Sequence, residues 1–467
     1  MTLAGETETV PHHDLMIIGT GSGNSVIGPE HDHLDIAIVE RDVFGGTCLN
    51  RGCVPSKMYV YAADLAELAR RGPALGVDTR FHGSDWKSIR DRIFDRIDPI
   101  ADGGEAYRKG LPNVTVYQGN GRFVGDRMLH VEGDGLVADV SADQVILAAG
   151  SRVSVPDVPG LRDVPFHTSD TIMRIDELPE HLLVYGGGYI AAELAHVFGA
   201  LGVRITIIAR SETMLTFEDD DIRMRFTEIY RRRPGFEVLA STQVLAARPG
   251  GDGIELDVSV DGAHRTLTGD MLLVATGRIP NSDELDVAAA GVDVDALGFV
   301  VTDEHLHTSA PGVWALGDIC NPAMLKHAAN ADARVVAHNI VSPGDLRLAD
   351  RRFLPHAVFG HPQVASVGAT ERALSAADVP ISVALQPFGG TAYGWAMEDT
   401  ESFCKLIAHR HTRQLLGAHI IGPQASTLIQ QVIQGMRFGL TVDQMARDQY
   451  YIHPALTEVV EQALLAL

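Results

Sequence analysis

The sequence predicts an α/β protein with two Rossmann-like dinucleotide-binding domains followed by a C-terminal α+β domain. Two observations predict the first part: an apolar strand that runs into a glycine-rich turn occurs twice, and each copy is followed by a similar return strand. A third observation predicts the last domain, because from Phe353 onward the pattern changes to short strands and helices without a glycine turn. The length of 467 residues agrees with about three domains.

The first copy begins with the apolar run 15–18 and the glycine turn 19–24, and a second strand, 36–39, ends at Glu40. Glycines in such a turn let the backbone approach a pyrophosphate, and an acid after the second strand accepts hydrogen bonds from ribose hydroxyls. Asn24 stands where a third glycine is expected, and the pair at 28–29, Gly-Pro, should cut the intervening helix short. Alone, this match is weak, because a chance turn has the same pattern.

The second copy runs from the strand 182–185 into the turn 186–191, which has the spacing G-x-G-x-x-A, and its next strand, 204–208, leads to Arg210. The return strands 145–151 and 272–278 each contain A-x-G. A matched pair of this kind indicates an internal duplication, and hence two bound dinucleotides.

Cys48 and Cys53 follow the first copy closely. Their spacing fits no common zinc site, and a bent helical turn can bring two such sulfurs within bonding distance. An isolated C-x4-C is more often two unrelated small residues. Here glycines precede the pair, Lys57 follows it and a dinucleotide fold surrounds it, so we predict a redox pair that faces a flavin.

Composition excludes several classes of function. The chain is 45% apolar and 21% charged, as in ordinary globular proteins, and its net charge of −23 disfavours nucleic acid as a partner. Residues 1–14 have no cationic or apolar signal region, and no apolar run approaches the ~18 residues of a membrane helix. Four cysteines are too few for a secreted disulfide scaffold, so we expect a cytoplasmic enzyme without a membrane partner.

The remaining segments are assigned from periodicity. Amphipathic spacing predicts helices at 64–71 and 86–97, and Pro280 with Asn281 marks a boundary after the second copy. In the C-terminal domain we expect strands at 364–368, 381–385, 403–407 and 418–421, and helices at 425–438 and 442–447.

These residues resemble the flavoprotein pyridine nucleotide–disulfide oxidoreductases, which include glutathione reductase and dihydrolipoamide dehydrogenase. The likeness runs from Leu15 to about Ala463, and its most specific parts are G-G-T-C-L-N-R-G-C-V-P-S-K at 45–57, A-L-G-D at 315–318 and H-P-A-L-T-E at 453–458. Stretches at 19–25, 96–101, 325–327 and 392–400 point to one subgroup, in which Asn24 is the expected residue.

The resemblance implies FAD in the first copy and a nicotinamide nucleotide in the second. Asp318 would hold the ribityl chain, and Tyr189 is a plausible gate for the nicotinamide. The residues implied for FAD are Gly19, Gly21, Ser22, Asn24, Glu40, Gly46, Thr47, Lys57, Gly121, Ala149, Gly150, Asp318, Leu325 and His327. The residues implied for the nicotinamide nucleotide are Gly186, Gly188, Tyr189, Ile190, Arg210 and Gly277.

The resemblance also implies the catalytic roles. Cys48 would be the attacking thiol and Cys53 the sulfur nearest the flavin, with Lys57 and Glu193 paired beside it. His453 would be the base and Glu458 its orienting acid. Lys57 could instead be a solvated helix residue, Glu193 a surface acid, and His453 a surface or packing residue.

A dihydrolipoamide dehydrogenase normally has an acid where this chain has Arg210, so we expect NADPH, unless Arg210 is merely exposed. The expected reaction is reduction of a low-molecular-weight disulfide. Mercuric reductase fits poorly, because no second cysteine pair lies near the C-terminus. A flavin-binding redox sensor without turnover would leave the cysteines, His453 and Glu458 unexplained.

The resemblance further implies a homodimer whose C-terminal module forms the interface and completes the partner's site. The expected segments are an FAD-binding domain in two parts, 1–152 and 279–350, an NAD(P)H-binding domain, 153–278, and a dimerisation domain, 351–467.

Overall fold

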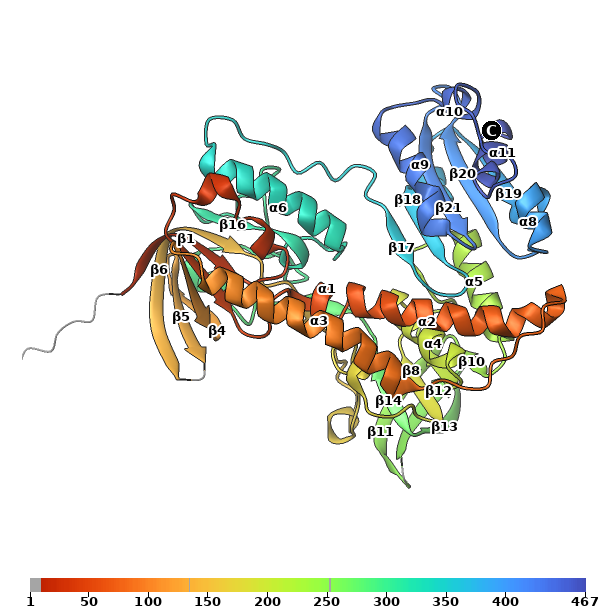
Figure 1. Cartoon of the computed structure of the whole chain (residues 1–467), viewed down its shortest axis with the longest axis horizontal. Helices are drawn as coiled ribbons and strands as arrows, with labels where there is room; N and C mark the ends of the chain where they lie inside the picture. The colour runs from red at the N-terminus through yellow and green to blue at the C-terminus, as the bar shows by residue number, and fades with distance from the viewer. Residues whose placement is uncertain (1–9, 134, 252) are drawn as a thin grey trace, which may run out of the picture. The chain divides into compact units, whose positions relative to one another are not determined.

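A computed structural model describes residues 10–133, 135–251 and 253–467 (Figure 1). The chain forms two compact units. The first comprises residues 1–55, 91–154 and 278–350, and the second comprises 56–90, 155–277 and 351–467. These units are coarser than the four segments expected from the sequence, so those segment boundaries stay a prediction. Residues 1–9, part of the polar start of the chain, lie outside the described residues.

The first unit contains a seven-stranded sheet of the described residues, in the order β3-β2-β1-β6-β5-β4, with β16 also paired to β6. The strands β1, β2, β3, β6 and β16 are parallel, as the strand–turn–strand pattern predicted, whereas β4 and β5 are antiparallel to their neighbours. The strand bounds are β1 His12–Ile18, β2 Ile36–Glu40, β3 Val114–Gln118, β4 Asn120–Gly125, β5 Met128–Gly133, β6 Leu136–Leu147 and β16 Val313–Ala315. A short ladder joins β7 (Ser151–Val153) to β15 (Arg278–Pro280).

Alternate side chains of β1 enter cores on opposite faces of this sheet. Met16 and Ile18 pack in one core with Val39 of β2, whereas Leu15 and Ile17 pack in the other, against helix α6 (Lys326–Val341). Strands buried on both faces are typical of a parallel sheet, and this explains why the run 15–18 is apolar throughout.

The prediction of a helix, even a short one, between β1 and β2 is wrong. Two 3-10 turns of three residues each, η1 (Gly23–Ser25) and η2 (Pro29–His31), replace it. Pro29 starts the second turn, and the preceding Gly28 is extended, so no α-helix can continue through this segment.

Besides α6, one described helix lies in the first unit, another begins in it and a third ends in it. Helix α1 (Gly46–Asn50) lies between β2 and α2 (Cys53–Arg71), and α3 spans Trp86–Lys109. The expected amphipathic helices at 64–71 and 86–97 are therefore parts of α2 and α3, which are longer than predicted.

The second unit contains a parallel nucleotide-binding sheet in the order β10-β9-β8-β14 and a three-stranded antiparallel sheet β11-β12-β13. The duplicated pattern is confirmed here with its helix intact, because α4 (Tyr189–Ala200) follows the second glycine turn directly. The other bounds are β8 His181–Tyr185, β9 Arg204–Ile208, α5 Asp220–Arg232, β10 Phe236–Leu239, β11 Thr242–Gly250, β12 Gly253–Val260, β13 Ala263–Gly269 and β14 Met271–Val274.

The C-terminal part of this unit is a sheet in the order β17-β18-β21-β20-β19, with helices packed on it. The expected strand 364–368 and helix 442–447 are confirmed with their predicted bounds, and the others differ by a few residues at their ends. The bounds are β17 His356–Val358, β18 Val364–Gly368, α7 Glu371–Ala376, β19 Ile381–Pro387, α8 Ala392–Ala396, β20 Phe403–His409, β21 Leu415–Ile421, α9 Ala425–Arg437, α10 Val442–Arg447 and α11 Glu458–Leu465.

Lys405 of β20 ties this sheet to the nucleotide-binding part. Its buried ammonium lies 2.7 Å from Asp219, which caps α5, and 2.6 Å from both Asp221 and Glu371. Burial alone would lower the pKa of Lys405, but hydrogen bonds to three carboxylates raise it. No helix in the described part of the chain is long and apolar enough to cross a membrane.

Candidate active site

The first glycine turn holds a buried carboxylate. Thr20 donates to Oε2 of Glu40 through its backbone N–H (2.8 Å) and its hydroxyl (2.6 Å), and the Asp42 N–H donates to Oε1 (2.9 Å). At Gly19, with φ of +101°, a Cβ atom would lie 2.4 Å from the Ala148 carbonyl oxygen. Only glycine fits there, so the turn can pass close to the return strand with Glu40 fixed beside it.

The helix that carries Cys48 packs directly on this turn. A Cβ atom at Gly46, the first residue of α1, would lie 2.7 Å from the Gly21 Cα atom. Asn50 fixes the other end of α1 by donating from Nδ2 to the carbonyl oxygens of Phe44 (2.9 Å) and Gly46 (3.2 Å). The exposed Thr47 lies between these anchors.

Cys48 and Cys53 are both thiols in the structure, one half-buried on α1 and the other exposed at the first turn of α2. Hydrogen bonding to Cys53, followed by burial, raises the pKa of Cys48, and the charge of Lys326 opposes this effect. The two thiols are therefore close enough to interact, and their role as a redox pair stays a prediction. A Cys48 thiol held protonated by its neighbour needs a base before it can attack.

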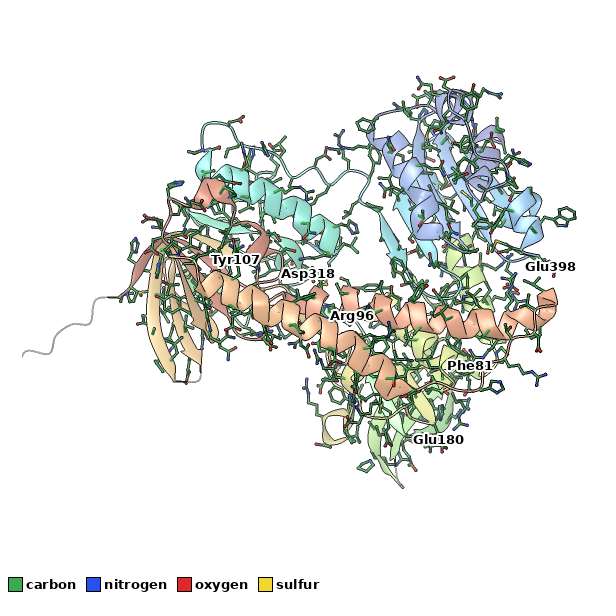
Figure 2. The ribbon with its side chains drawn as sticks, viewed as in Figure 1. Phe81, Arg96, Tyr107, Glu180, Asp318 and Glu398 are labelled. Atoms are coloured by element: carbon green, nitrogen blue, oxygen red, sulfur yellow. The ribbon has the colours of Figure 1, made fainter. Side chains whose placement is uncertain are left out.

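Asp318 lies in the turn after β16, as its A-L-G-D context predicted (Figure 2). Its carboxylate accepts a hydrogen bond from the Ser151 hydroxyl (2.8 Å), and burial raises its pKa, opposed by Ser151, Arg278 and Lys326. Ala149 and Gly150 come directly before Ser151 in the chain. Asn281 donates a hydrogen bond to the carbonyl oxygen of each of them.

The segment 325–327 begins helix α6, with Leu325 as its N-cap and His327 exposed. Between them Lys326 turns toward the first glycine turn, where its Nζ atom donates to the Ser22 hydroxyl (2.9 Å). Gly121 lies in β4, where a Cβ atom would come within 3.3 Å of Val39, the neighbour of Glu40.

The second glycine turn has the close approach that its spacing predicted. A Cβ atom at Gly186 would lie 2.2 Å from the Ala275 carbonyl oxygen, whereas Gly188 and Gly277 have open space around the corresponding position. Tyr189 and Ile190 open α4 and are half-buried. The Tyr189 ring meets Phe217 edge-on, at a centroid distance of 6.3 Å.

Arg210 follows β9 and is exposed. Exposure leaves its guanidinium able to meet an anionic ligand, and the same exposure also fits an ordinary surface arginine.

Lys57 and Glu193 form an ion pair, with Nζ of Lys57 2.6 Å from Oε2 of Glu193. Phe359, which follows β17, contacts both partners. Its backbone N–H donates to Oε1 of Glu193 (2.9 Å), and its ring centroid lies 4.5 Å from the Lys57 ammonium. The predicted pair is thus held by a residue of the C-terminal part that sequence reasoning missed.

His453 and Glu458 are paired as predicted, with Nδ1 of His453 2.8 Å from Oε1 of Glu458. Glu458 is the first residue of α11, where the helix dipole stabilises a carboxylate. The His453 side chain is 71% exposed, and no described residue hydrogen-bonds its Nε2 atom. A ring oriented through Nδ1 in this way presents Nε2 for proton transfer with a group from outside.

The structure therefore brings some predicted residues together in pairs: Glu40 with the first glycine turn, Cys48 with Cys53, Lys57 with Glu193, and His453 with Glu458. Sequence reasoning missed Lys326, Phe359, and Arg108, which holds Asn24 from α3. One signal could have identified Lys326: only five of the 38 basic residues are lysines, namely Lys57, Lys87, Lys109, Lys326 and Lys405. Three of the five, Lys57, Lys326 and Lys405, donate hydrogen bonds to polar side chains. At such sites a compact ammonium and a planar guanidinium are least interchangeable.

Replacement of Lys326 by methionine should slow alkylation of Cys48 at neutral pH. Loss of the ammonium removes the charge that lowers the pKa of Cys48, so less thiolate is present at any given pH. We expect a roughly two- to tenfold lower rate with iodoacetamide in the reduced protein, and a pH profile shifted upward. Lys87→Met, at an exposed lysine, is the control. An unchanged profile would show that Lys326 does not act on Cys48.

Comparison with known proteins identifies the family. A profile described as pyridine nucleotide-disulphide oxidoreductase matches residues 13–333, and the dimerisation domain of the same family matches residues 354–464. Among solved structures, a Cu(II) complex of the HOCl-induced flavoprotein disulfide reductase RclA from Escherichia coli superposes with a TM-score of 0.87. The two sequences are 26% identical, and the match covers 98% of this chain and 99% of the other.

Curated relatives match over nearly their whole length. The chain is 48% identical to mycothione reductase of Mycobacterium tuberculosis, with 97% of this chain and 99% of the relative covered. It is 34% identical to mercuric reductase of Streptomyces lividans (95% and 94% covered) and 30% identical to dihydrolipoyl dehydrogenase of Chlamydia muridarum (97% and 97% covered). The chain therefore belongs to the pyridine nucleotide–disulfide oxidoreductase family, as an FAD- and NAD(P)H-dependent enzyme of thiol–disulfide chemistry that forms a homodimer through its C-terminal domain.

Proposed function

We propose that the protein reduces mycothione to mycothiol with electrons from NADPH, through FAD and the Cys48–Cys53 pair. The observation that carries the proposal is the thiol pair on α1 and α2, packed against the first glycine turn in a chain 48% identical to a mycothione reductase. The agreement of the segments 19–25, 96–101, 325–327 and 392–400 with that subgroup supports the same substrate.

The residues present fit both cofactors. At Gly19 and Gly186 a Cβ atom would collide with a backbone carbonyl oxygen, and the space beside Gly188 is open. Glu40 offers a fixed carboxylate of the kind that holds a ribose. FAD would be held by the first turn, Glu40 and Asp318, and the nicotinamide nucleotide by the second turn, Tyr189 and Arg210. When bound, FAD supplies the relay that moves two electrons from the nicotinamide to the disulfide.

The thiol chemistry follows from the pair itself. The Cys48 thiolate attacks one sulfur of the substrate disulfide, so that a mixed disulfide forms and the first thiol leaves with a proton. Cys53 then attacks the Cys48 sulfur, which releases the second thiol and restores the Cys48–Cys53 disulfide. Because the Cys48 pKa is raised in the dithiol, removal of its proton by a base is an essential step.

His453 is the proposed base, and we place it in the partner's site. Its Nδ1 atom is occupied by Glu458, its Nε2 atom has no partner among the described residues, and its side chain is exposed on the domain that makes the dimer. Glu458 fixes the tautomer and stabilises the imidazolium that forms when the proton is taken.

Turnover with three disulfides tests the function. With NADPH as the reductant, mycothione should be reduced much faster than glutathione disulfide or lipoamide. Faster turnover of lipoamide would favour a dihydrolipoamide dehydrogenase. No turnover of any of them, in a protein that binds FAD, would leave the redox sensor as the better account.

Nucleotide choice is tested at Arg210. Replacement of Arg210 by glutamate should raise the KM for NADPH about 10- to 100-fold, because it removes a charge-assisted contact worth about 1.5–3 kcal/mol, and it should spare NADH. Arg204→Glu, at an exposed arginine at the other end of β9, is the matched control. Equal use of NADH by the wild-type enzyme would rule out this role for Arg210.

Subunit mixing tests the shared site. Chains with Cys48→Ser and chains with His453→Gln should each be inactive, and exchange between them should restore part of the activity. The mixed dimer has one site with both defects and one with neither. If subunit exchange is demonstrated and activity does not return, His453 serves the cysteines of its own chain.

Phe359 allows a test of the Lys57–Glu193 pair. Phe359→Leu should slow flavin reduction by NADPH, because it removes a cation–π contact worth about 0.5–2 kcal/mol, and Phe359→Tyr should restore it. In a Lys57→Met background, Phe359→Leu should have no further effect. Phe403→Leu, which removes a ring over Arg225 in the same domain, is the control. Equal losses in both backgrounds would mean that Phe359 acts by packing alone.

A further inference from the structure

The first dinucleotide turn lacks the element that normally supplies its positive charge. A Rossmann turn binds a pyrophosphate at the N-terminus of the following helix, where unpaired N–H groups and the helix dipole favour an anion. Here every residue between β1 and β2 is described, and only two three-residue 3-10 turns are present. The second turn of the same chain retains its helix of 12 residues. The first site therefore receives no charge from a following helix, and positive side chains around the turn can supply it instead.

Arg108 is one such residue. It lies near the end of α3, next to Tyr107 (Figure 2), and is buried. Its Nε atom donates to the side-chain oxygen of Asn24 (2.7 Å) and its Nη2 atom to the Asn24 carbonyl oxygen (2.8 Å). Both acceptors are neutral, and no described carboxylate lies within ion-pair distance of Arg108. Burial lowers the pKa of Arg108, as expected for a guanidinium without a counter-charge.

Lys326 is the second residue that can supply positive charge to the first glycine turn. Its ammonium donates to Ser22, two residues before Asn24 in the same turn. Lys326 is the first residue of α6, a position where the helix dipole disfavours a cation, and the first turn of that helix contains no acid. No described carboxylate lies within ion-pair distance of its Nζ atom either. The Asp318 carboxylate feels the charge of Lys326 but lies outside ion-pair distance, so a cation retained at the positive end of a helix still lacks a directly paired anion.

We propose that Arg108 and Lys326 are cofactor-binding residues that flank the turn at Asn24 and Ser22 and hold the FAD pyrophosphate in place of the missing helix. This rests on the placement of FAD at the first glycine turn, as proposed above. It also gives Asn24 a function at the position of the third glycine. Its side-chain oxygen anchors the guanidinium, which glycine could not do.

The dissociation constant of FAD tests the proposal. We would measure FAD released from the diluted holoenzyme by its fluorescence, at several sodium chloride concentrations. Arg108→Met and Lys326→Met should each raise the dissociation constant at least about tenfold at low salt, as for loss of a charge-assisted contact. Both variants should also make the dissociation constant less dependent on salt, because the charge that salt screens has been removed. Lys109→Met, at the exposed residue next to Arg108, should change neither quantity.

The salt dependence separates charge from packing. Weaker FAD binding with an unchanged salt dependence would mean that the residues only brace the turn, and would overturn the proposal. An FAD affinity like that of the wild type in both variants would also overturn it. If Arg108→Met fails to fold, Lys326→Met still tests the loss of charge. Arg108→Lys, which retains the charge, should then retain the salt dependence. Glu40→Gln tests separately whether FAD binds at the first glycine turn. If FAD affinity is unaltered in that variant, FAD does not bind there. The proposed disulfide chemistry is then tested by the turnover assay alone.

Discussion

The redox half of the molecule depends on one close contact between two glycines. At Gly46 a Cβ atom would lie 2.7 Å from the Gly21 Cα atom, and the Gly46 backbone has a φ of +63°. A side chain at Gly46 would push the helix that carries Cys48 away from the first glycine turn. Because electron transfer between a dithiol and a flavin requires contact distances, this steric constraint fixes where Cys48 lies relative to the turn proposed to hold FAD.

Around that contact the chain concentrates positive charge, although its net charge is −23. Lys326 contacts the glycine turn and opposes the raised pKa values of both Cys48 and Asp318. Its charge thus favours the anionic form of both groups. In the second unit the corresponding cation, Lys57, is instead compensated by Glu193 and covered by Phe359 of the C-terminal domain. The domain that makes the dimer therefore also supports the ion pair proposed to lie beside the flavin.

Much of this could be predicted from the sequence, because it depends on local signals. The strand 364–368 and the helix 442–447 follow from periodicity and turn residues, and the pairing of His453 with Glu458 was implied by the resemblance of H-P-A-L-T-E at 453–458 to the family. The helix after the first glycine turn was predicted wrongly. The strand–turn–strand pattern favoured it, but the Gly28-Pro29 pair ended it more completely than expected.

The remaining contacts are long-range, and single-sequence patterns do not predict them. Arg108 reaches Asn24 across 84 residues, and Lys326 reaches Ser22 across 304. Phe359 meets Glu193 only because β17 passes α4 in the folded chain. The local sequence pattern around each of these residues can predict a helix or a strand. It carries no information about the distant residue that each of them contacts.

The central claim is that Cys48 and Cys53 exchange electrons with the bound flavin, and an anaerobic reductive titration tests it most directly. Dithionite should be added to the oxidised holoenzyme while the flavin and long-wavelength absorbance are recorded, for the wild type and for Cys53→Ser. The account predicts that the wild type takes up two electron pairs per FAD, the first of them producing the long-wavelength band, and that the variant takes up one pair without it. Uptake of a single pair by the wild type, with the Cys48–Cys53 disulfide left unreduced, would contradict the account.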